Sequence, residues 1–347
     1  MLAHLRANLW LLVLTVVLCS VLYPLAIWGL GQGLFHDKAQ GSLLTDSHGQ
    51  AVGSRLIAQP FTDNAPEYFQ PRPSAASYNA AASGCSNWAA NNYLLRDRVA
   101  RQLGPIVTYR SGPKKGQLVA PDIESWFQKD QFDGKPEIVA QWANAHTTVA
   151  QNWVKADKLN AAYVADWQKA HAAEVATWIK ANPDTPAEPK PEDLAVPFFA
   201  SYAKDHPGTF PSGVDHKTAD GKTEKRIEPV KEGSDIQSGF FDMWLQAHAE
   251  VDLQPVPADM VTSSGSGLDP HITLANARWQ LNHRVAAAWA KKNHAEEEKL
   301  VTEIDRLLVE KSQSPLGGLV GEPLVNVLEI NLALRDQYQN TSAAEKQ

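Results

Sequence analysis

Beyond Leu30 the chain lacks a second long apolar run, and this absence limits how often it can cross a membrane. No later stretch approaches the roughly 18 consecutive apolar residues that a spanning helix requires. A dense Lys/Arg patch is also missing, and the net charge is −7. Nucleic-acid-binding proteins usually carry a basic patch or stripe, so nucleic acid is not an expected partner.

Catalytic and metal-binding motifs are equally scarce. The sequence contains no G-x-S-x-G nucleophile elbow, no H-E-x-x-H zinc motif and no G-x-x-x-x-G-K-[ST] phosphate loop. Its two cysteines, Cys19 and Cys85, form no C-x-x-C pair, and the eleven histidines are scattered. We therefore predict no catalytic residue, no metal site and no firmly bound cofactor.

The one long apolar run is Leu9 to Leu30, which contains no charged side chain. As a helix it would be about 33 Å long, enough to cross a hydrocarbon core of about 30 Å. Pro24 removes one helical hydrogen bond and is expected to bend the outer half. Because small residues let membrane helices approach closely, we predict a helix-packing face at this end, formed by Tyr23, Pro24, Gly29, Gly31 and Gly33.

A cleaved signal peptide is the alternative for this run. Its apolar region would be about 7–15 residues long and would end in small residues before a cleavage site. The run here is longer and ends in AIWGLGQGLF without an A-x-A pattern, which favours a retained anchor. Arg6 and the amino terminus precede the span and Lys38 follows it, so the charge bias favours a cytoplasmic N-terminus and a soluble part outside the cytoplasm.

The soluble part begins with a hairpin and a loop. Residues 41–61 carry two apolar runs around Asp46-Ser47-His48-Gly49, which predicts a β-hairpin. Residues 67–92 are rich in Pro, Ser, Gly and Asn but contain four aromatic residues, so we expect a loop that is ordered against a core. Residues 93–103 are typical of a short helix ended by Gly104-Pro105.

A tryptophan-rich stretch follows at residues 137–181. Trp142, Trp153, Trp167 and Trp178 would lie within about 40° of one another on a helix surface. We expect one long helix, or two helices broken near the middle, ending at Asn182-Pro183. The stripe fits a buried face packed within an insertion better than the alternative, a face that docks a partner.

The rest of the chain alternates helices with connecting segments. We predict an exposed charged segment at 217–231, a short helix at 238–251, a helix capped by Thr273 and a second helix at 296–310. Within 317–334 we expect a strand, a turn at 321–323 and a closing helix. The polar residues 339–347 predict a disordered tail.

The densest polar cluster is TSSGSGLDPH at residues 262–271. Glycines and hydroxyls near a helix N-terminus can form an anion nest, which makes candidate nucleotide contacts of four residues: Ser264, Gly265, Ser266 and Gly267. The alternative is a tight structural loop in which Asp269 accepts hydrogen bonds from backbone amides and His271 packs under it. Since a lone Gly/Ser run is a weak signal of phosphate binding, the residues favour the structural loop.

Several phrases occur in a set order along the chain. HLRANLWLLVLTVVLCSVLYPLAIWGLGQGLF is followed by GSLL, VGSRLIAQPF and YFQPRPSAASYNAAASGCSNW, and later by SGSGLDPHIT, ARWQLNHRVA and GLVGEPLVNVLEINLAL. This order resembles the C subunit (KdpC family) of the Kdp-type potassium-transporting ATPase, over roughly 1–103 and 253–336. The chain departs from the family pattern at Ala58, Pro71 and Cys85, where Gly is usual, and residues 104–252 have no counterpart in compact members.

Together the patterns and the resemblance predict an α+β protein. One N-terminal transmembrane helix is followed by a small mixed α/β soluble domain that carries a mainly helical insertion. The expected parts are a cytoplasmic N-terminus at 1–8, the transmembrane helix at 9–31, the soluble core domain at 32–103 and 253–338, the Trp-rich insertion at 104–252 and the tail at 339–347.

The function that the resemblance implies is that of an accessory, non-catalytic subunit of an ATP-driven, high-affinity potassium uptake pump in the cell (inner) membrane. Its partners would be the ATP-hydrolysing P-type subunit, the potassium-channel-like subunit and membrane lipid. The family is described as a catalytic chaperone that raises the ATP affinity of the P-type subunit, which would make residues 264–267 an ATP contact. A soluble domain outside the cytoplasm would meet no ATP, and assembly would then be the natural role. The alternative is a membrane-tethered scaffold or binding protein that works through the Trp-rich insertion.

Overall fold

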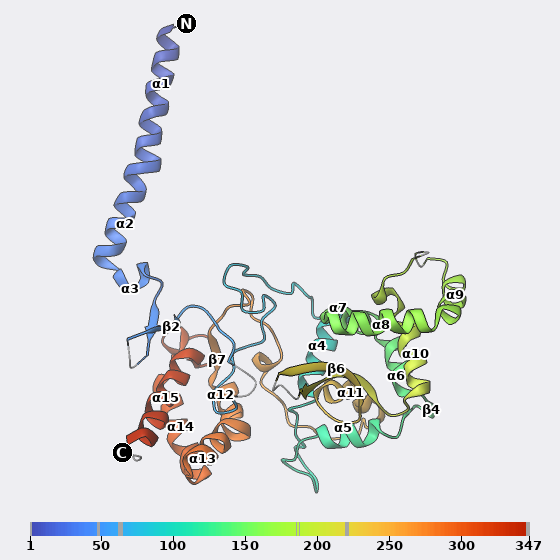
Figure 1. The fold of residues 1–347 in the computed structure, drawn as a ribbon. Helices are drawn as coiled ribbons and strands as arrows, with labels where there is room; N and C mark the ends of the chain where they lie inside the picture. Colours follow the sequence, from blue (N-terminus) through green and yellow to red (C-terminus); the bar gives the residue numbers. More distant parts are fainter. Residues whose placement is uncertain are drawn as a thin grey trace. The chain divides into compact units, whose positions relative to one another are not determined.

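The computed structural model describes residues 2–46, 49–61, 65–184, 186, 188–218 and 222–344. The chain divides into two compact units (Figure 1). Unit 1 comprises Met1–Asn87 and Pro257–Gln347, and unit 2 comprises Trp88–Val256. Unit 2 therefore interrupts unit 1 in the sequence.

The apolar N-terminal run forms one long helix, Leu2–Leu34, which is drawn as a continuous rod in Figure 1. It consists of α1 (Leu2–Val16), a π-helical turn (Val17–Leu22) and α2 (Tyr23–Leu34). The π-turn precedes Pro24 directly, and the Tyr23 N–H donates to the Leu18 carbonyl oxygen five residues back. The helix is longer than the predicted span of 9–31 and, by length and composition, can cross a membrane once.

Unit 1 joins two antiparallel strand pairs to a group of helices. Strand β1 (Leu43–Thr45) pairs with β2 (Ala51–Ser54), which confirms the expected hairpin, although turn residues 47 and 48 lie outside the described residues. Strand β7 (His271–Thr273) pairs with β8 (Leu324–Asn326). The helices are α3 (His36–Ala39), α12 (Leu274–Gln280), α13 (Ala286–Asn293), α14 (Glu297–Lys311) and α15 (Val327–Ala344), with a π-turn between α12 and α13.

The core of unit 1 draws side chains from both ends of the chain. Phe69, from the N-terminal loop, is completely buried among apolar residues of α12–α15 and the β7–β8 pair, including Trp289 and Ile304. At Phe69 the polar loop at 67–92 thus packs against a core, as its aromatic content predicts. Thr273 caps α12 as expected, because its side chain accepts a hydrogen bond from the Asn276 N–H.

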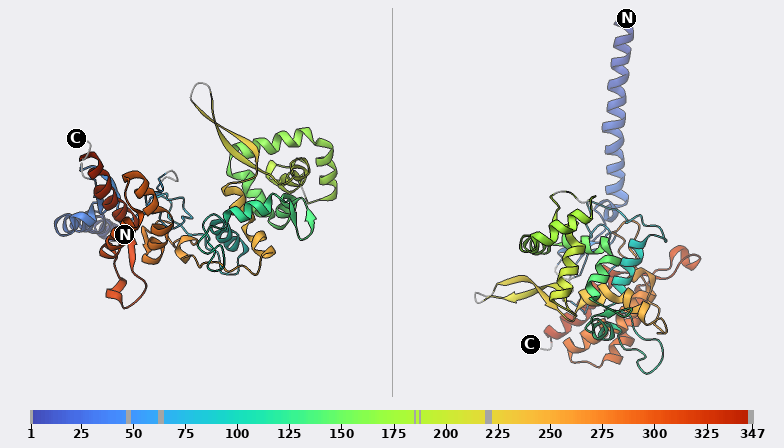
Figure 2. Two further views of the ribbon diagram at one scale, coloured as in Figure 1. Left: turned by 90° about the horizontal axis from the view of Figure 1, so that it is seen from below. Right: turned by 90° about the vertical axis from the view of Figure 1, so that its right-hand side faces the viewer.

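Unit 2 is mainly helical, with two antiparallel strand pairs among its described residues. Its helices are α4 (Tyr93–Leu103), α5 (Ala120–Phe127), α6 (Ile138–Ala145), α7 (Thr147–Ala156), α8 (Lys158–Ala170), α9 (Ala172–Ala181), α10 (Ala195–Asp205) and α11 (Ser234–Ala247). Its strands are β3 (Gln131–Phe132), β4 (Lys135–Pro136), β5 (Phe210–Lys217) and β6 (Thr223–Val230). Figure 2 shows the β5–β6 hairpin projecting from the helices.

Within unit 2, the segment after α4 pairs with the segment near the C-terminal end of the unit. The Gln254 N–H donates to the Thr108 carbonyl oxygen over 2.8 Å, and the Arg110 N–H donates to the Asp252 carbonyl oxygen over 2.9 Å. Residues near the two expected boundaries of the insertion, 104 and 252, therefore lie close in space.

The tryptophan stripe is not one or two helices, as the sequence predicted, but four. Breaks fall at His146, Asp157 and His171, and the last helix ends at Ala181 as expected. His146 and His171 each stand four residues after a tryptophan, and each imidazole Nδ1 lies 3.0–3.2 Å from that tryptophan's carbonyl oxygen. Such a side-chain bond to the backbone competes with helix continuation, so the histidine adopts a non-helical backbone conformation.

The tryptophans themselves contribute to the core of unit 2. Trp142 is 1% exposed, and Trp153, Trp167 and Trp178 are partly buried against the same cluster. Trp142 meets Phe199 edge to face with ring centroids 5.2 Å apart, a favourable geometry for aromatic pairs. The interpretation of the stripe as a packing face is therefore confirmed.

Other expectations need correction. Helix α4 belongs to unit 2, so the boundary of the interrupting part lies at 88 and 256 rather than at 104 and 252. The described residues of the charged segment at 217–231 are mostly exposed, as expected, but they include strand β6. In the C-terminal part the strand follows the turn at 321–323, since it pairs with β7. Helix α15 extends to Ala344, so the predicted disorder is wrong for 339–344, while 345–347 lie outside the described residues.

Candidate functional site

The Gly/Ser loop at 262–271 lies in unit 1 and leads into β7. Ser264 and Gly267 are buried, whereas Gly265 and Ser266 are exposed at the tip. The loop therefore directs two of its four candidate nucleotide-binding residues into the protein and two toward solvent.

A second loop, at 74–84, holds the first one through hydrogen bonds to its carbonyl groups. The Ser74 hydroxyl donates to the Gly267 carbonyl oxygen over 2.5 Å. The Gly84 N–H and the Ser83 hydroxyl both donate to the Ser266 carbonyl oxygen, over 2.9 and 3.0 Å. These bonds fix the loop on its own domain.

Gly267 is required by its conformation and by its neighbour. Its φ is +68°, in the left-handed region that favours glycine. A Cβ at this position would lie 2.6 Å from the Gly84 carbonyl oxygen, closer than any packing can accommodate without a backbone shift. Glycine at this position therefore allows the two loops to pack against each other.

The backbone amides of the loop are largely used within it. The Gly267 N–H donates to the Ser264 carbonyl oxygen, the Leu268 N–H to the Ser266 hydroxyl, and the Asp269 N–H to the Ser264 hydroxyl. An anion nest needs successive N–H groups directed at the ligand. Here the N–H groups of residues 267, 268 and 269 are occupied by acceptors within the loop itself.

Asp269 and His271 form a compact pair beyond the tip. Asp269 Oδ1 accepts the His271 backbone N–H at 3.0 Å and lies 3.0 Å from His271 Nδ1. Burial alone would raise the pKa of the Asp269 carboxyl, but the His271 hydrogen bonds and the charge of Arg72 lower it below its ordinary value. Arg72 Nη2 also donates a hydrogen bond to the Ser263 carbonyl oxygen over 3.4 Å, so this side chain contacts the loop as well.

The predicted packing face of the membrane helix has open surroundings. A Cβ at Gly29 or Gly33 would meet nothing within 4 Å, and one at Gly31 would meet only the Ala39 Cβ at 3.7 Å. Tyr23 is 65% exposed, and Pro24 follows it in the first turn of α2. The described part of this chain leaves the face free for lipid or another helix.

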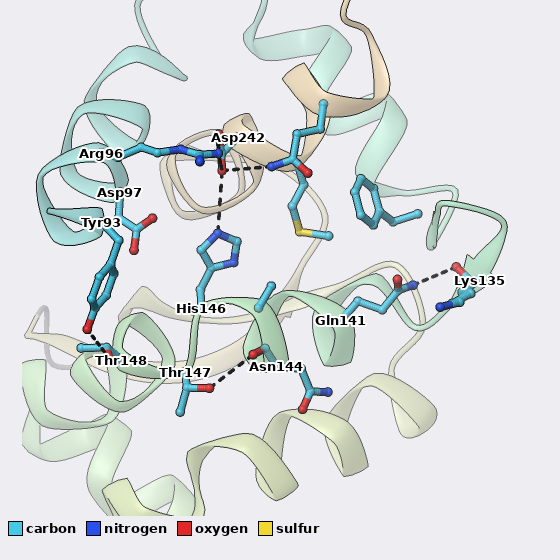
Figure 3. A pocket seen from close by; sticks show the side chains of 14 residues that line it. Tyr93, Arg96, Asp97, Lys135, Gln141, Asn144, His146, Thr147, Thr148 and Asp242 are labelled. Atoms are coloured by element: carbon cyan, nitrogen blue, oxygen red, sulfur yellow. Dashed lines mark hydrogen bonds and ion pairs between the residues drawn. The ribbon is translucent and has the colours of Figure 1, made fainter. Parts of the chain in front are cut away.

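Unit 2 contains a polar cavity of about 820 Å³ that the sequence did not reveal. Figure 3 shows Arg96 and His146 converging on Asp242, with the carboxylate of Asp97 beside them. Arg96 donates to both carboxylate oxygens of Asp242, over 2.8 and 3.0 Å. His146 Nε2 lies 3.9 Å from the same carboxylate.

The charges of this cavity shift one another's pKa values. The interaction with Asp242 raises the pKa of the His146 imidazole, and His146 and Arg96 lower the pKa of Asp242. Burial raises the pKa of the Asp97 carboxyl, which forms no ion pair within 4.0 Å among the described residues. Arg96 and Asp242 are 146 residues apart, so no local motif could join them. The sequence signal for this site was the segment WANAH at 142–146, whose histidine directly follows α6.

None of these groups forms a metal centre. In the part of the chain that the structure describes, no three His, Cys, Asp or Glu residues are placed to hold a metal ion. The main features are thus a membrane helix, a hydrogen-bonded polar loop and a charged cavity in the interrupting unit.

The helix and the two-part domain define a single-pass membrane protein whose α+β core is assembled from segments on both sides of a second unit. A family model described as K+-transporting ATPase, c chain, matches residues 5–123 and 224–336. The chain belongs to this KdpC family. Residues 124–223, between the two matched segments, all lie in unit 2.

Curated relatives carry the same family name. A potassium-transporting ATPase KdpC subunit from Methanosphaerula palustris is 48% identical over 118 residues, which cover 34% of this chain and 62% of the relative. The KdpC subunit of Pseudomonas putida strain GB-1 is 42% identical over 111 residues, covering 32% and 60%. That of Geobacter sulfurreducens is 44% identical over 125 residues, covering 35% and 64%. The chain thus spans about three fifths of the length of each.

Proposed function

We propose that the chain is an accessory subunit of an ATP-driven potassium uptake pump and that it supports assembly of the complex in the membrane. The observation that carries this proposal is the position of the family match. It covers the two segments that build unit 1, including the membrane helix and the core around Phe69. Its partners would be the ATP-hydrolysing P-type subunit and the potassium-channel-like subunit.

Two surfaces of unit 1 suit this role. One is the glycine face of the membrane helix, where small residues allow close helix contact. The other is an apolar loop after α14, in which Leu316 is 76% exposed, Leu319 87% and Val320 62%. Adjacent exposed apolar side chains of this size are typical of interaction sites. We assign subunit contacts to both surfaces.

The exposed loop gives the assembly role a direct test. Replacing Leu319 with Ser should reduce co-purification of the pump subunits while leaving the melting temperature of the chain unchanged, because the side chain has few contacts within it. Val309→Ser is the matched control, since Val309 is an apolar residue that is 49% exposed on α14. Equal co-purification of both variants would remove the loop from the proposal.

The alternative role is that of a catalytic chaperone that raises the ATP affinity of the P-type subunit. It depends on the side of the membrane on which the soluble domain lies. We infer a soluble domain outside the cytoplasm, where ATP is absent, and the occupied amides of residues 267–269 favour a structural loop. A topology reporter fused after Gln347 should be active only outside the cytoplasm. Activity of a cytoplasmic reporter would reverse this assignment and favour an ATP contact through the exposed Gly265 and Ser266.

The scaffold alternative assigns the working surface to unit 2. Its tryptophan stripe is engaged in the unit's own core, which disfavours a docking face. Replacement of residues 88–256 with a short flexible linker should leave unit 1 folded and assembled with the pump, because the Gly84 N–H already bonds the Ser266 carbonyl oxygen across the junction. Loss of assembly with unit 1 still folded would support the scaffold.

A further inference from the structure

A second cavity in unit 2, of about 740 Å³, contains two arginines that form no ion pair within 4.0 Å among the described residues. Arg98 and Arg101 both line it from α4. Residues three apart on a helix lie on neighbouring parts of one face, so α4 directs two guanidinium groups to the same cavity. Trp88 and Trp153 supply apolar walls.

Neither guanidinium is neutralised by a carboxylate within 4.0 Å in the described residues. Arg98 lies over the Trp88 ring, 4.8 Å from its centroid, and its Nε is buried without a hydrogen-bond partner among the described protein atoms. Desolvation lowers the pKa of Arg101, and Asp235 and Asp97 offset this only through their more distant charges. Buried charges are normally paired, because desolvation without a partner is costly.

A third group, the Gln102 side-chain oxygen, needs a hydrogen-bond donor rather than an acceptor. Gln102 lines the cavity, and its Oε1 is buried without a donor among the described residues. Among the described residues, the arginines therefore lack a negatively charged acceptor, and the glutamine oxygen lacks a hydrogen-bond donor. A carboxylate supplies only the first, whereas a phosphate group near its second pKa supplies both oxygens and an O–H.

Three acidic residues also line the cavity: Asp97, Asp157 and Asp235. Asp157 caps α8 by accepting the Leu159 N–H and lies 3.8 Å from Lys225 Nζ. Asp235 accepts a hydrogen bond from the Ser212 hydroxyl in the first turn of α11. Burial raises the pKa of the Asp97 carboxyl, which forms no ion pair within 4.0 Å among the described residues. None of the three carboxylates lies within 4.0 Å of either guanidinium group, so Arg98 and Arg101 are left without an ion pair among the described residues.

We propose that this cavity binds a small phosphate-bearing molecule, with its phosphate oxygens on Arg98 and Arg101 and its P–OH donated to Gln102. Arginine suits such a site because its N–H groups match phosphate oxygens in charge-assisted, bidentate geometry. The cavity is larger than a phosphate ion and falls in the size range of small-molecule sites. The rest of the ligand contacts Trp88 and Trp153.

Titration calorimetry of the full chain in detergent tests the proposal with three probes at constant ionic strength: inorganic phosphate, sulfate and phenyl phosphate. We expect phenyl phosphate to bind more tightly than phosphate, and phosphate more tightly than sulfate, which has no proton to donate. Arg101→Gln should weaken phosphate binding about tenfold or more, and Arg101→Lys by less. Gln102→Leu should remove the preference for phosphate over sulfate.

Two controls separate this site from others. Arg226→Gln removes an arginine that is ion-paired with Glu224 on β6, outside the cavity, and should leave binding unchanged. Ser266→Ala changes the loop of unit 1 and should also leave it unchanged. The proposal is overturned if phosphate does not saturate below about 10 mM, if Arg101→Lys and Arg101→Gln both bind as the unaltered chain does, or if only Ser266→Ala reduces binding.

Discussion

The side chain of Asn331 clamps the backbone of Phe69 with two hydrogen bonds. The Phe69 N–H donates to Asn331 Oδ1 over 2.8 Å, and Asn331 Nδ2 donates to the Phe69 carbonyl oxygen over 2.9 Å. Gln280 binds Gln70 in the same two-way manner. A loop from the N-terminal segment is thereby attached to helices from the C-terminal segment, so one core forms although unit 2 intervenes.

Removing this clamp should destabilise unit 1. Asn331→Ala leaves the N–H and carbonyl of Phe69 buried without partners, which typically costs about 1–3 kcal/mol. Denaturant unfolding of the full chain in detergent should detect the loss, and hydrogen exchange should be faster at Phe69. Asn282→Ala, at an exposed position of the π-turn, should change stability by less than about 0.5 kcal/mol. Equal stability of the two variants would contradict the importance of the clamp.

The Gly/Ser loop offers a matched pair of glycines. Gly267→Ala should lower the free energy of unfolding by about 1–3 kcal/mol, because alanine is strained at φ +68° and its Cβ would approach the Gly84 carbonyl oxygen. Gly265→Ala should be nearly neutral, since a Cβ there meets nothing within 4 Å. Thermal unfolding of both variants checks this, and a neutral Gly267→Ala would show that the loop contact is not required.

The Asp269 carboxyl should contribute stability that depends on pH. Its folded-state pKa lies below the ordinary value of 3.8, so the contribution is present above about pH 4 and is lost as the pH falls through the folded-state pKa. Asp269→Asn removes the titrating group. The stability difference between the unaltered chain and this variant should therefore shrink on acidification, as followed by denaturant unfolding from neutral to acidic pH. A difference that stays constant with pH would contradict the assignment.

The His146–Asp242 contact predicts the opposite dependence in unit 2. The folded-state pKa of His146 lies above its ordinary value of 6.5, so the stabilisation is complete below that pH and is lost as the pH rises through the folded-state pKa. His146→Gln should cost more stability at acidic than at alkaline pH. His171→Gln is the control, because His171 stacks on Trp167 in the same way without an ion pair in the described residues. The cost of His146→Gln should change with pH by more than the cost of His171→Gln.

Much of the architecture was predictable because it rests on local patterns. The apolar run of α1 and α2, the capping Thr273 and the bounds of α4 all follow from residues adjacent in sequence. The four-helix division of the tryptophan stripe was missed, since helical periodicity continues through His146 and His171 while their ring hydrogen bonds end the helices. The recurring phrase Trp-x-x-Ala-His was the unused signal.

The charged sites of unit 2 could not be predicted in the same way. The Arg96–Asp242 contact joins residues 146 positions apart, and the exposure of a guanidinium depends on packing that no local pattern encodes. Likewise, Gly267 stands in a run that fits an anion nest, and only its approach to Gly84 shows what the glycine accommodates. Long-range contacts, rather than residue types, determine these roles.

The central claim is that this chain acts as a subunit of a potassium-transporting ATPase. The most direct measurement is affinity purification of the tagged full chain from membranes of its native host, with the bound proteins identified by mass spectrometry and the eluate assayed for ATP hydrolysis. We predict that a P-type ATPase subunit and a potassium-channel-like subunit co-purify in fixed proportion, with ATPase activity that depends on potassium. Recovery of the intact, folded chain without either subunit would contradict the account.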